Sequence, residues 1–151
     1  MKRVWSLVLG FGLLCAGHVP GRADEAVDFA PVPAASVALV DLLYLKRPVV
    51  VFADSPNDPN FLRQMDLLSR EAAELSERDV IVVIDTDPAA LSDWRKTLRP
   101  RGFSLVLMDK DGKAVIRKPL PWDVREITHA IDKFPLRRQE ILQGGRAATG
   151  G

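Results

Sequence analysis

The sequence predicts an α/β domain with a mixed β-sheet, and three observations support this fold class. Two short runs, 49–53 and 80–84, are apolar and rich in β-branched residues, which is typical of parallel strands covered on both faces. The segment between them carries apolar residues at helical spacing. The last third of the chain has an Asp-Gly turn between two extended runs, followed by a capped helix. A parallel half followed by an antiparallel hairpin makes the sheet mixed.

The chain opens with a segment typical of export. Met1, Lys2 and Arg3 give a basic start, a short apolar run follows, and small residues around Ala23 suit a signal peptidase. The apolar run has about a dozen residues, fewer than the roughly 20 of a membrane-spanning helix. Residues 1–23 are therefore predicted to form a signal peptide. The mature chain is expected in the periplasm or outside the cell, without membrane contact after cleavage.

Removal of this leader leaves a chain without thiols, because Cys15 is the only cysteine. Three of the 21 basic side chains and none of the 20 acidic ones lie in the leader, which leaves 18 basic against 20 acidic side chains. This balance does not suit a nucleic-acid partner, which calls for a strongly basic face. The remaining length is enough for one domain with its own core, and no cofactor is expected.

The mature chain divides into a lead-in, a domain and a tail. Residues 24–46 form the lead-in, in which 30–33 is predicted to be extended and 36–46 is apolar enough for a short helix. The domain is predicted over 47–142. Residues 143–151 are small and poor in apolar side chains, so ordering them would cost chain entropy with little burial in return. A disordered tail is expected there.

The helix between the two apolar strands is predicted from its cap and its apolar face. Pro59 suits the first turn, because its missing N–H needs no partner there, and Asn57 or Asp58 is a good N-cap. The apolar face is formed by Phe61, Met65, Leu68, Ala72 and Leu75. The result is a β-α-β unit whose two strands are parallel neighbours.

Turn and cap signals organise the second half of the domain. A helix is expected to start at Asp87 and Pro88 and to end at Pro100. Strands are expected over 103–108 and 114–118. The Asp-Gly pair between these strands favours a tight hairpin with a type I′ turn.

A capping box indicates the last helix. Asp123 caps it, and Glu126 stands three residues further on. The apolar face is formed by Val124, Ile127, Ile131 and Phe134. His129 falls on the opposite side of this helix, so it is expected to be a solvated surface residue.

Two stretches resemble thioredoxins. The string IDTDP at 84–88 resembles their Ile-Asp-x-Asn-Pro, and RGFS at 101–104, followed by an apolar strand, resembles their Arg-Gly-Ile-Pro. This similarity covers roughly residues 47–134 and implies a thioredoxin-like fold. More narrowly, the phrases KRPVVVFADS and RPRGFSLVLMDKDG resemble a secreted bacterial domain-of-unknown-function family, whose relatives are the thioredoxin-like domains of vertebrate sushi-repeat-containing extracellular matrix proteins. The resemblance implies no particular activity.

The same resemblance implies that a thioredoxin redox centre has lost its sulfur. Aligning Phe52 with the phenylalanine of the central thioredoxin strand places Asn57-Asp58-Pro59-Asn60 on the Cys-Gly-Pro-Cys motif, and the family's cis-proline falls on Ser104. A carboxamide can neither attack a disulfide nor resolve one, so a redox-inactive domain is expected. A cis bond before Ser104 would cost about 3 kcal/mol, so the bond between Phe103 and Ser104 is predicted to be trans.

The candidate site is a surface for a protein or peptide partner. The first turn of a helix presents free N–H groups and the positive end of its dipole, which can bind an anion, a carbonyl or a peptide backbone. In thioredoxins the backbone just before the cis-proline, here Phe103, pairs with an extended peptide. The predicted partner-binding residues are Asp54, Asn57, Asp58, Asn60, Phe103 and Ser104. The alternative interpretation is that Asn57, Asp58 and Asn60 serve only in capping and turn chemistry.

Two other functions stay open. Asp54, Asp58, Asp85 and Asp87 are expected near the carboxyl ends of adjacent parallel strands, and carboxylate oxygens in this number suit calcium. This alternative is a calcium-type metal-binding protein, although an aspartate before Pro88 is also an ordinary helix cap. The third alternative is an enzyme of unrecognised mechanism, but no nucleophile–base pair is evident and no catalytic residue or metal ligand is assigned.

Overall fold

The computed structural model describes residues 27–149, so the predicted signal peptide, residues 1–23, lies outside the described residues. Within this range a five-stranded sheet has the order β1-β3-β2-β4-β5. Its strands are β1 Val32–Pro33, β2 Arg47–Phe52, β3 Val80–Asp85, β4 Ser104–Met108 and β5 Ala114–Lys118. The central pair β2 and β3 is parallel as predicted, whereas β2 with β4 and β4 with β5 are antiparallel. The mixed sheet is therefore confirmed.

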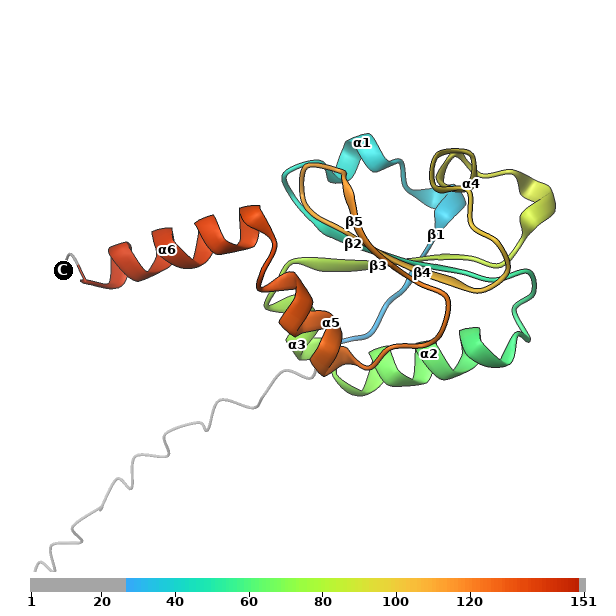
Figure 1. The fold of residues 1–151 in the computed structure, drawn as a ribbon, viewed down its shortest axis with the longest axis horizontal. Helices are drawn as coiled ribbons and strands as arrows, with labels where there is room; N and C mark the ends of the chain where they lie inside the picture. The colour runs from blue at the N-terminus through green and yellow to red at the C-terminus, as the bar shows by residue number, and fades with distance from the viewer. Residues whose placement is uncertain (1–26, 150–151) are drawn as a thin grey trace, which may run out of the picture.

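Helices cover both faces of the sheet (Figure 1). One face carries α2 Pro59–Arg70, α3 Ala72–Ser76 and α5 Val124–Ile131, and the other carries η1 Ala34–Ser36, α1 Leu39–Leu42 and α4 Asp93–Leu98. Successive residues of β2 point to opposite faces, so Val49 and Val51 pack in the first layer while Val50 and Phe52 pack in the second. This double burial explains why the strand is apolar on both faces.

The helix predicted between β2 and β3 is divided into two. Glu71, with φ of −129°, ends α2 and precedes α3, while Phe61, Leu68 and Leu75 of the predicted apolar face are buried. The fully buried side chain of Gln64 joins α2 to the segment before α5. Its amide donates to the Trp122 carbonyl at 2.9 Å and accepts from the Trp122 N–H at 2.8 Å.

The lead-in is less helical than predicted. The helix expected over 36–46 is limited to the four residues of α1. Its C-cap, Leu43, leaves the helical conformation with ψ of 130°, and Tyr44 then has a positive φ. The extended segment forms β1, which pairs with β3 in parallel through Val32 and Pro33. The main chain of the lead-in thus completes an edge of the sheet.

The helix expected from Asp87 begins later. Asp87 caps only the short 3-10 turn η2 Pro88–Ala90, and Leu91 then has a left-handed backbone and a largely exposed side chain. Ser92 is the true N-cap of α4, because its Oγ accepts from the Arg95 N–H at 3.1 Å. The predicted start at Asp87 is therefore wrong for α4, whose cap is of the expected kind but lies at Ser92.

The hairpin between β4 and β5 does not use a type I′ turn. Such a turn needs positive φ at two residues, but of the Asp-Gly pair only Gly112, at 80°, has it. The Gly112 N–H donates to the Asp109 carbonyl at 3.0 Å, and the register shifts between Leu107 and Met108. The connection therefore covers residues 109–113, as the predicted strand bounds imply, but it is not the two-residue turn. A side chain at Gly112 would also meet Leu43, because an added Cβ would lie 2.8 Å from its Cδ2.

The last predicted helix is confirmed as α5, where the Asp123 carboxylate accepts from the Glu126 N–H at 2.9 Å and His129 is exposed. A further helix, α6 Pro135–Thr149, projects from the domain body (Figure 1). It runs through 143–149, for which the sequence predicted no ordered structure. No helix in the described range is both long and apolar enough to cross a membrane.

Candidate functional site

The loop from β2 to α2 places the two predicted asparagines at the head of α2. Asp58 is the N-cap, and its Oδ1 accepts from the N–H groups of Asn60 at 2.8 Å and Phe61 at 3.1 Å. Pro59, the first helical residue, has no N–H to offer. The protein's own carboxylate therefore already occupies the helix start, and little of the predicted capacity for a foreign anion is left there.

The asparagine side chains have a different role from that of Asp58. The backbone N–H of Asn57 donates to Ser55 Oγ at 3.2 Å, but the carboxamides of Asn57 and Asn60 form no hydrogen bond with any described residue. Asn57 is exposed and Asn60 is half-buried. The capping interpretation therefore accounts for Asp58 and leaves both amides without an internal role.

Replacing Asp58 with Ala is expected to lower the free energy of unfolding by about 1 kcal/mol, because two N–H groups lose their acceptor. Asn57→Ala is the matched control and should change the unfolding free energy by less than about 0.5 kcal/mol, as is usual for surface sites. Urea unfolding followed by circular dichroism measures both. An equal loss in the two variants would show that Asn57 also supports the loop.

The other predicted segment, Phe103 and Ser104, lies beside the end of β2. Ser104 pairs with Phe52 across the sheet, and the described residues contain no cis peptide bond, so the predicted trans bond is confirmed. The side chains of Phe103 and Ser104 are buried, at 7% and 5% exposure. Exposed Asp54 lies near Gly102, where an added Cβ would be 4.0 Å from Asp54 Oδ2. Of the predicted residues, Asp54 and Asn57 are thus exposed and Asn60 is half-buried, whereas Phe103 and Ser104 are buried.

A buried ion pair supports this edge of the sheet. Arg95 Nε donates to Asp85 Oδ1 at 2.7 Å, and the two side chains are 8% and 5% exposed. Arg95 also donates to the carbonyl of Ala53, directly before Asp54, and its guanidinium lies 5.4 Å from the centre of the Phe52 ring. The ion pair thus holds the C-terminal end of β2 in place. Sequence analysis missed Arg95, because nothing in its neighbourhood distinguishes it from a solvated helix residue.

The acidic cluster of the calcium alternative is not brought together. Asp85 is bonded to Arg95 and accepts from Ser92 Oγ, while Asp58 and Asp87 act as caps. Among residues 27–149 no group of three or more His, Cys, Asp or Glu side chains is placed to hold a metal ion. Three of the four aspartates therefore serve local structure one by one, and the fourth, Asp54, is exposed.

Three arginines line a pocket next to the predicted surface, and sequence analysis did not group them. Arg99 ends α4, Arg101 lies in the link to β4, and Arg117 lies on β5. The pocket has a volume of about 560 Å³, and its other lining residues are Leu98, Phe103, Ser104 and Pro119. Phe103 and Ser104 are thus shared between this pocket and the predicted partner-binding surface. We call it the arginine pocket.

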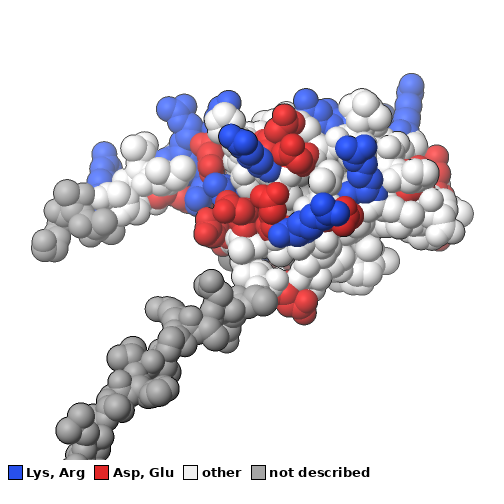
Figure 2. Space-filling view, turned by 90° about the horizontal axis from the view of Figure 1, so that it is seen from below, with Lys and Arg blue, Asp and Glu red and all other residues white. Residues whose placement is uncertain are grey.

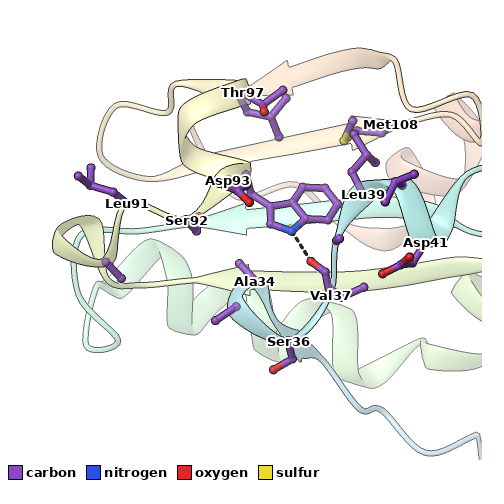
Figure 3. Close-up of a pocket in the computed structure, with 16 residues that line it drawn as sticks. Ala34, Ser36, Val37, Leu39, Asp41, Leu91, Ser92, Asp93, Thr97 and Met108 are labelled. Carbon is purple, nitrogen blue, oxygen red and sulfur yellow. Dashed lines mark hydrogen bonds between the residues drawn. The ribbon is translucent and has the colours of Figure 1, made fainter.

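A separate groove of about 650 Å³ runs between the lead-in and α4 (Figure 3). Its apolar lining includes Val37, Leu39, Trp94 and Met108, with polar side chains at Ser36, Asp41, Ser92, Asp93 and Thr97. The Trp94 Nε1–H donates to the Val37 carbonyl at 2.8 Å and so joins the two walls. None of the predicted site residues lines this groove.

The face formed by α2, α3 and α5 carries interspersed charges (Figure 2). Basic and acidic side chains lie next to one another there, as in the pairs of Arg78 with Asp132 at 3.0 Å and Arg70 with Asp66 at 2.6 Å. Such a face has no extended field of one sign, which a nucleic-acid surface would need.

The comparisons with known proteins agree with this architecture. Among solved structures, a chloroplastic thioredoxin z matches with a TM-score of 0.52 at 20% identity, over 70% of this chain and 95% of that chain. Desulfothioredoxin from Desulfovibrio vulgaris Hildenborough matches with a TM-score of 0.49 at 17% identity, over 67% and 95% of the two chains. The likeness to thioredoxin z shows that the protein has a thioredoxin-like fold, and at 20% identity it shows the fold alone.

The chain belongs to the DUF4174 family, a domain of unknown function, whose model matches residues 39–140. No significant match is found among curated proteins. The family match begins in α1 and ends in α6, so it includes the predicted surface, the buried Asp85–Arg95 pair and the arginine pocket.

Proposed function

We propose that the protein is a secreted, redox-inactive thioredoxin-like domain that binds a protein or peptide partner. The positions that the thioredoxin resemblance assigns to the redox cysteines are Asn57 and Asn60, and Cys15 falls in the predicted signal peptide. Thiol–disulfide exchange needs a thiolate, and a carboxamide cannot supply one. The protein would thus keep the thioredoxin-like fold and its surface at the head of α2 but would not catalyse thiol–disulfide exchange.

One observation carries the proposal: the carboxamides of Asn57 and Asn60 stand at the head of α2 without a hydrogen bond to any described residue. A carboxamide has both donors and an acceptor, which match the C=O and N–H groups of a peptide backbone. Asp58 holds the loop in place independently of them, so binding would cost little ordering of the loop.

The calcium alternative has weaker support, because Asp85 already has a cation and a hydroxyl as partners and Asp58 is engaged as a cap. Moving these oxygens onto a metal ion would leave buried Arg95 without its counter-charge. We therefore propose no metal at this edge.

Photo-crosslinking from position 57 of the full chain, expressed in its own cell, tests the proposal. A photoreactive residue at 57 is expected to give a discrete covalent adduct, because this side chain would lie at the partner interface. The matched control is the same residue at Gln139, an exposed amide on α6. Adducts of equal pattern from both positions, or none from 57, would contradict the proposed surface.

A further inference from the structure

The arginine pocket concentrates positive charge in a concave site. Arg99, Arg101 and Arg117 come from three separate segments, all three are exposed, and no acidic residue is among those that line the pocket. None of the three guanidinium groups forms an ion pair or hydrogen bond with a described residue. Three cations on one concavity repel one another, and an anion bound between them would relieve this repulsion.

The buried and half-buried arginines of the described residues show a different arrangement. Arg47, Arg78 and Arg95 each bond to at least one carboxylate within the domain. The folded structure therefore supplies internal anions where an arginine stabilises the fold. The arginine pocket has no such partner, so its anion would have to come from outside the described residues.

The backbone of Arg99 adds a second observation. Arg99 is the C-cap of α4 and has a left-handed conformation with φ of 48°, a position that glycine fills at lowest cost. A long cationic side chain is thus held in a disfavoured conformation at the rim of the pocket. The left-handed C-cap ends α4 at the pocket and so places Arg99 in its lining.

The apolar residues of the arginine pocket favour some anions over others. Leu98, Phe103 and Pro119 give the pocket an apolar part beside its guanidinium groups. A glutamate side chain matches this combination, because its methylene groups are apolar and its carboxylate accepts two parallel N–H bonds from an arginine. Arg117 belongs to β5, the edge strand of the sheet, which can pair with an extended chain.

We infer that the arginine pocket binds carboxylate side chains of an acidic, extended peptide segment. The inference rests on the proposed function, since it describes the chemistry of the partner at a surface that shares Phe103 and Ser104 with the pocket. The asparagines would then contact the partner backbone, while the arginines would select its charge.

Amide NMR of the full chain with three capped hexapeptides tests the inference. Hexaglutamate is expected to shift the resonances of Gly102, Ser104 and Lys118, whereas hexaglutamine and hexalysine should not. Replacing Arg99, Arg101 and Arg117 together with Gln should weaken hexaglutamate binding by roughly tenfold or more, because charge-assisted hydrogen bonds are lost. Arg125→Gln, an exposed arginine on α5, is the control and should leave binding unchanged.

Several outcomes would overturn the inference: no response to hexaglutamate, equal binding by the triple variant, or a response to inorganic phosphate alone. A variant with Phe at positions 57 and 60 separates this result from the proposed function. It should keep hexaglutamate binding while losing the physiological partner. If the otherwise unchanged chain gives no position-57 adduct but binds hexaglutamate, the proposed function alone is overturned. If it gives a discrete position-57 adduct but does not bind hexaglutamate, the pocket inference alone is overturned.

Discussion

Replacing Arg47 with Met is expected to lower the free energy of unfolding by about 3–5 kcal/mol, the usual cost of breaking a buried ion pair. The Arg47 side chain is fully buried at the start of β2. It donates to Asp109 at 3.1 Å, to the Arg78 carbonyl at 2.9 Å and to Glu140 of α6 at 2.9 Å. Methionine fills similar space but leaves the Asp109 carboxylate, 4% exposed, without its cation.

The same cluster gives the protein an acid-sensitive stability. Partial burial raises the pKa of Glu140, but hydrogen bonds and positive charge from Arg47 and Lys110 outweigh this effect and lower the pKa from 4.5 to about 2. Between these two values the unfolded chain binds a proton that the folded chain does not. The stabilisation is therefore complete above about pH 4.5, and is lost as the pH falls toward 2.

Chemical unfolding at pH 7 and pH 3 measures both effects. The control is Arg70→Met, which breaks the exposed pair with Asp66 and should cost less than about 1 kcal/mol. At pH 3 the stability gap between wild type and Arg47→Met should narrow, because Glu140 then contributes less. A cost for Arg47→Met no larger than that of the control would show that the buried cluster is dispensable.

Replacing Arg95 with Met is expected to cost a similar amount, about 3–5 kcal/mol, because Asp85 would remain buried without its counter-charge. The change also removes the hydrogen bond to the Ala53 carbonyl, at the base of the candidate surface. Partner capture should therefore weaken in this variant, unlike in Arg47→Met, which alters the opposite end of β2.

A double-mutant cycle with Asp85→Ala checks whether the two side chains act as a pair. The loss of unfolding free energy in the double variant is expected to be roughly 1–3 kcal/mol smaller than the sum of the two single losses. In the double variant no buried charge is left unpaired. Equilibrium unfolding of the four proteins supplies the values. Strict additivity would contradict a direct coupling between Arg95 and Asp85.

The parts of the fold that sequence predicted well depend on local patterns. The apolar runs of β2 and β3 and the capping box of Asp123 are readable from a few neighbouring residues. The β2 strand begins two residues earlier than predicted, at Arg47, because a buried arginine looks polar in a hydrophobicity pattern. Its partners Asp109 and Glu140 lie 62 and 93 residues away, so no local rule could find them.

The candidate site was predictable to a similar extent. Local capping rules placed Asn57, Asp58 and Asn60 at a helix start, but they could not decide which side chain is the cap. That choice depends on the loop geometry, which gives both N–H groups to Asp58. The arginine pocket was missed because Arg117 joins Arg99 and Arg101 only through the pairing of β5 with β4.

The most direct measurement of the central claim uses the Asn57→Phe and Asn60→Phe double variant in a quantitative pull-down of the crosslinked partner. With free amides as the binding groups, capture should fall to background while the unfolding midpoint stays at the wild-type value. Gln139→Phe should capture as well as wild type. Undiminished capture by a folded double variant would place the partner elsewhere on the molecule.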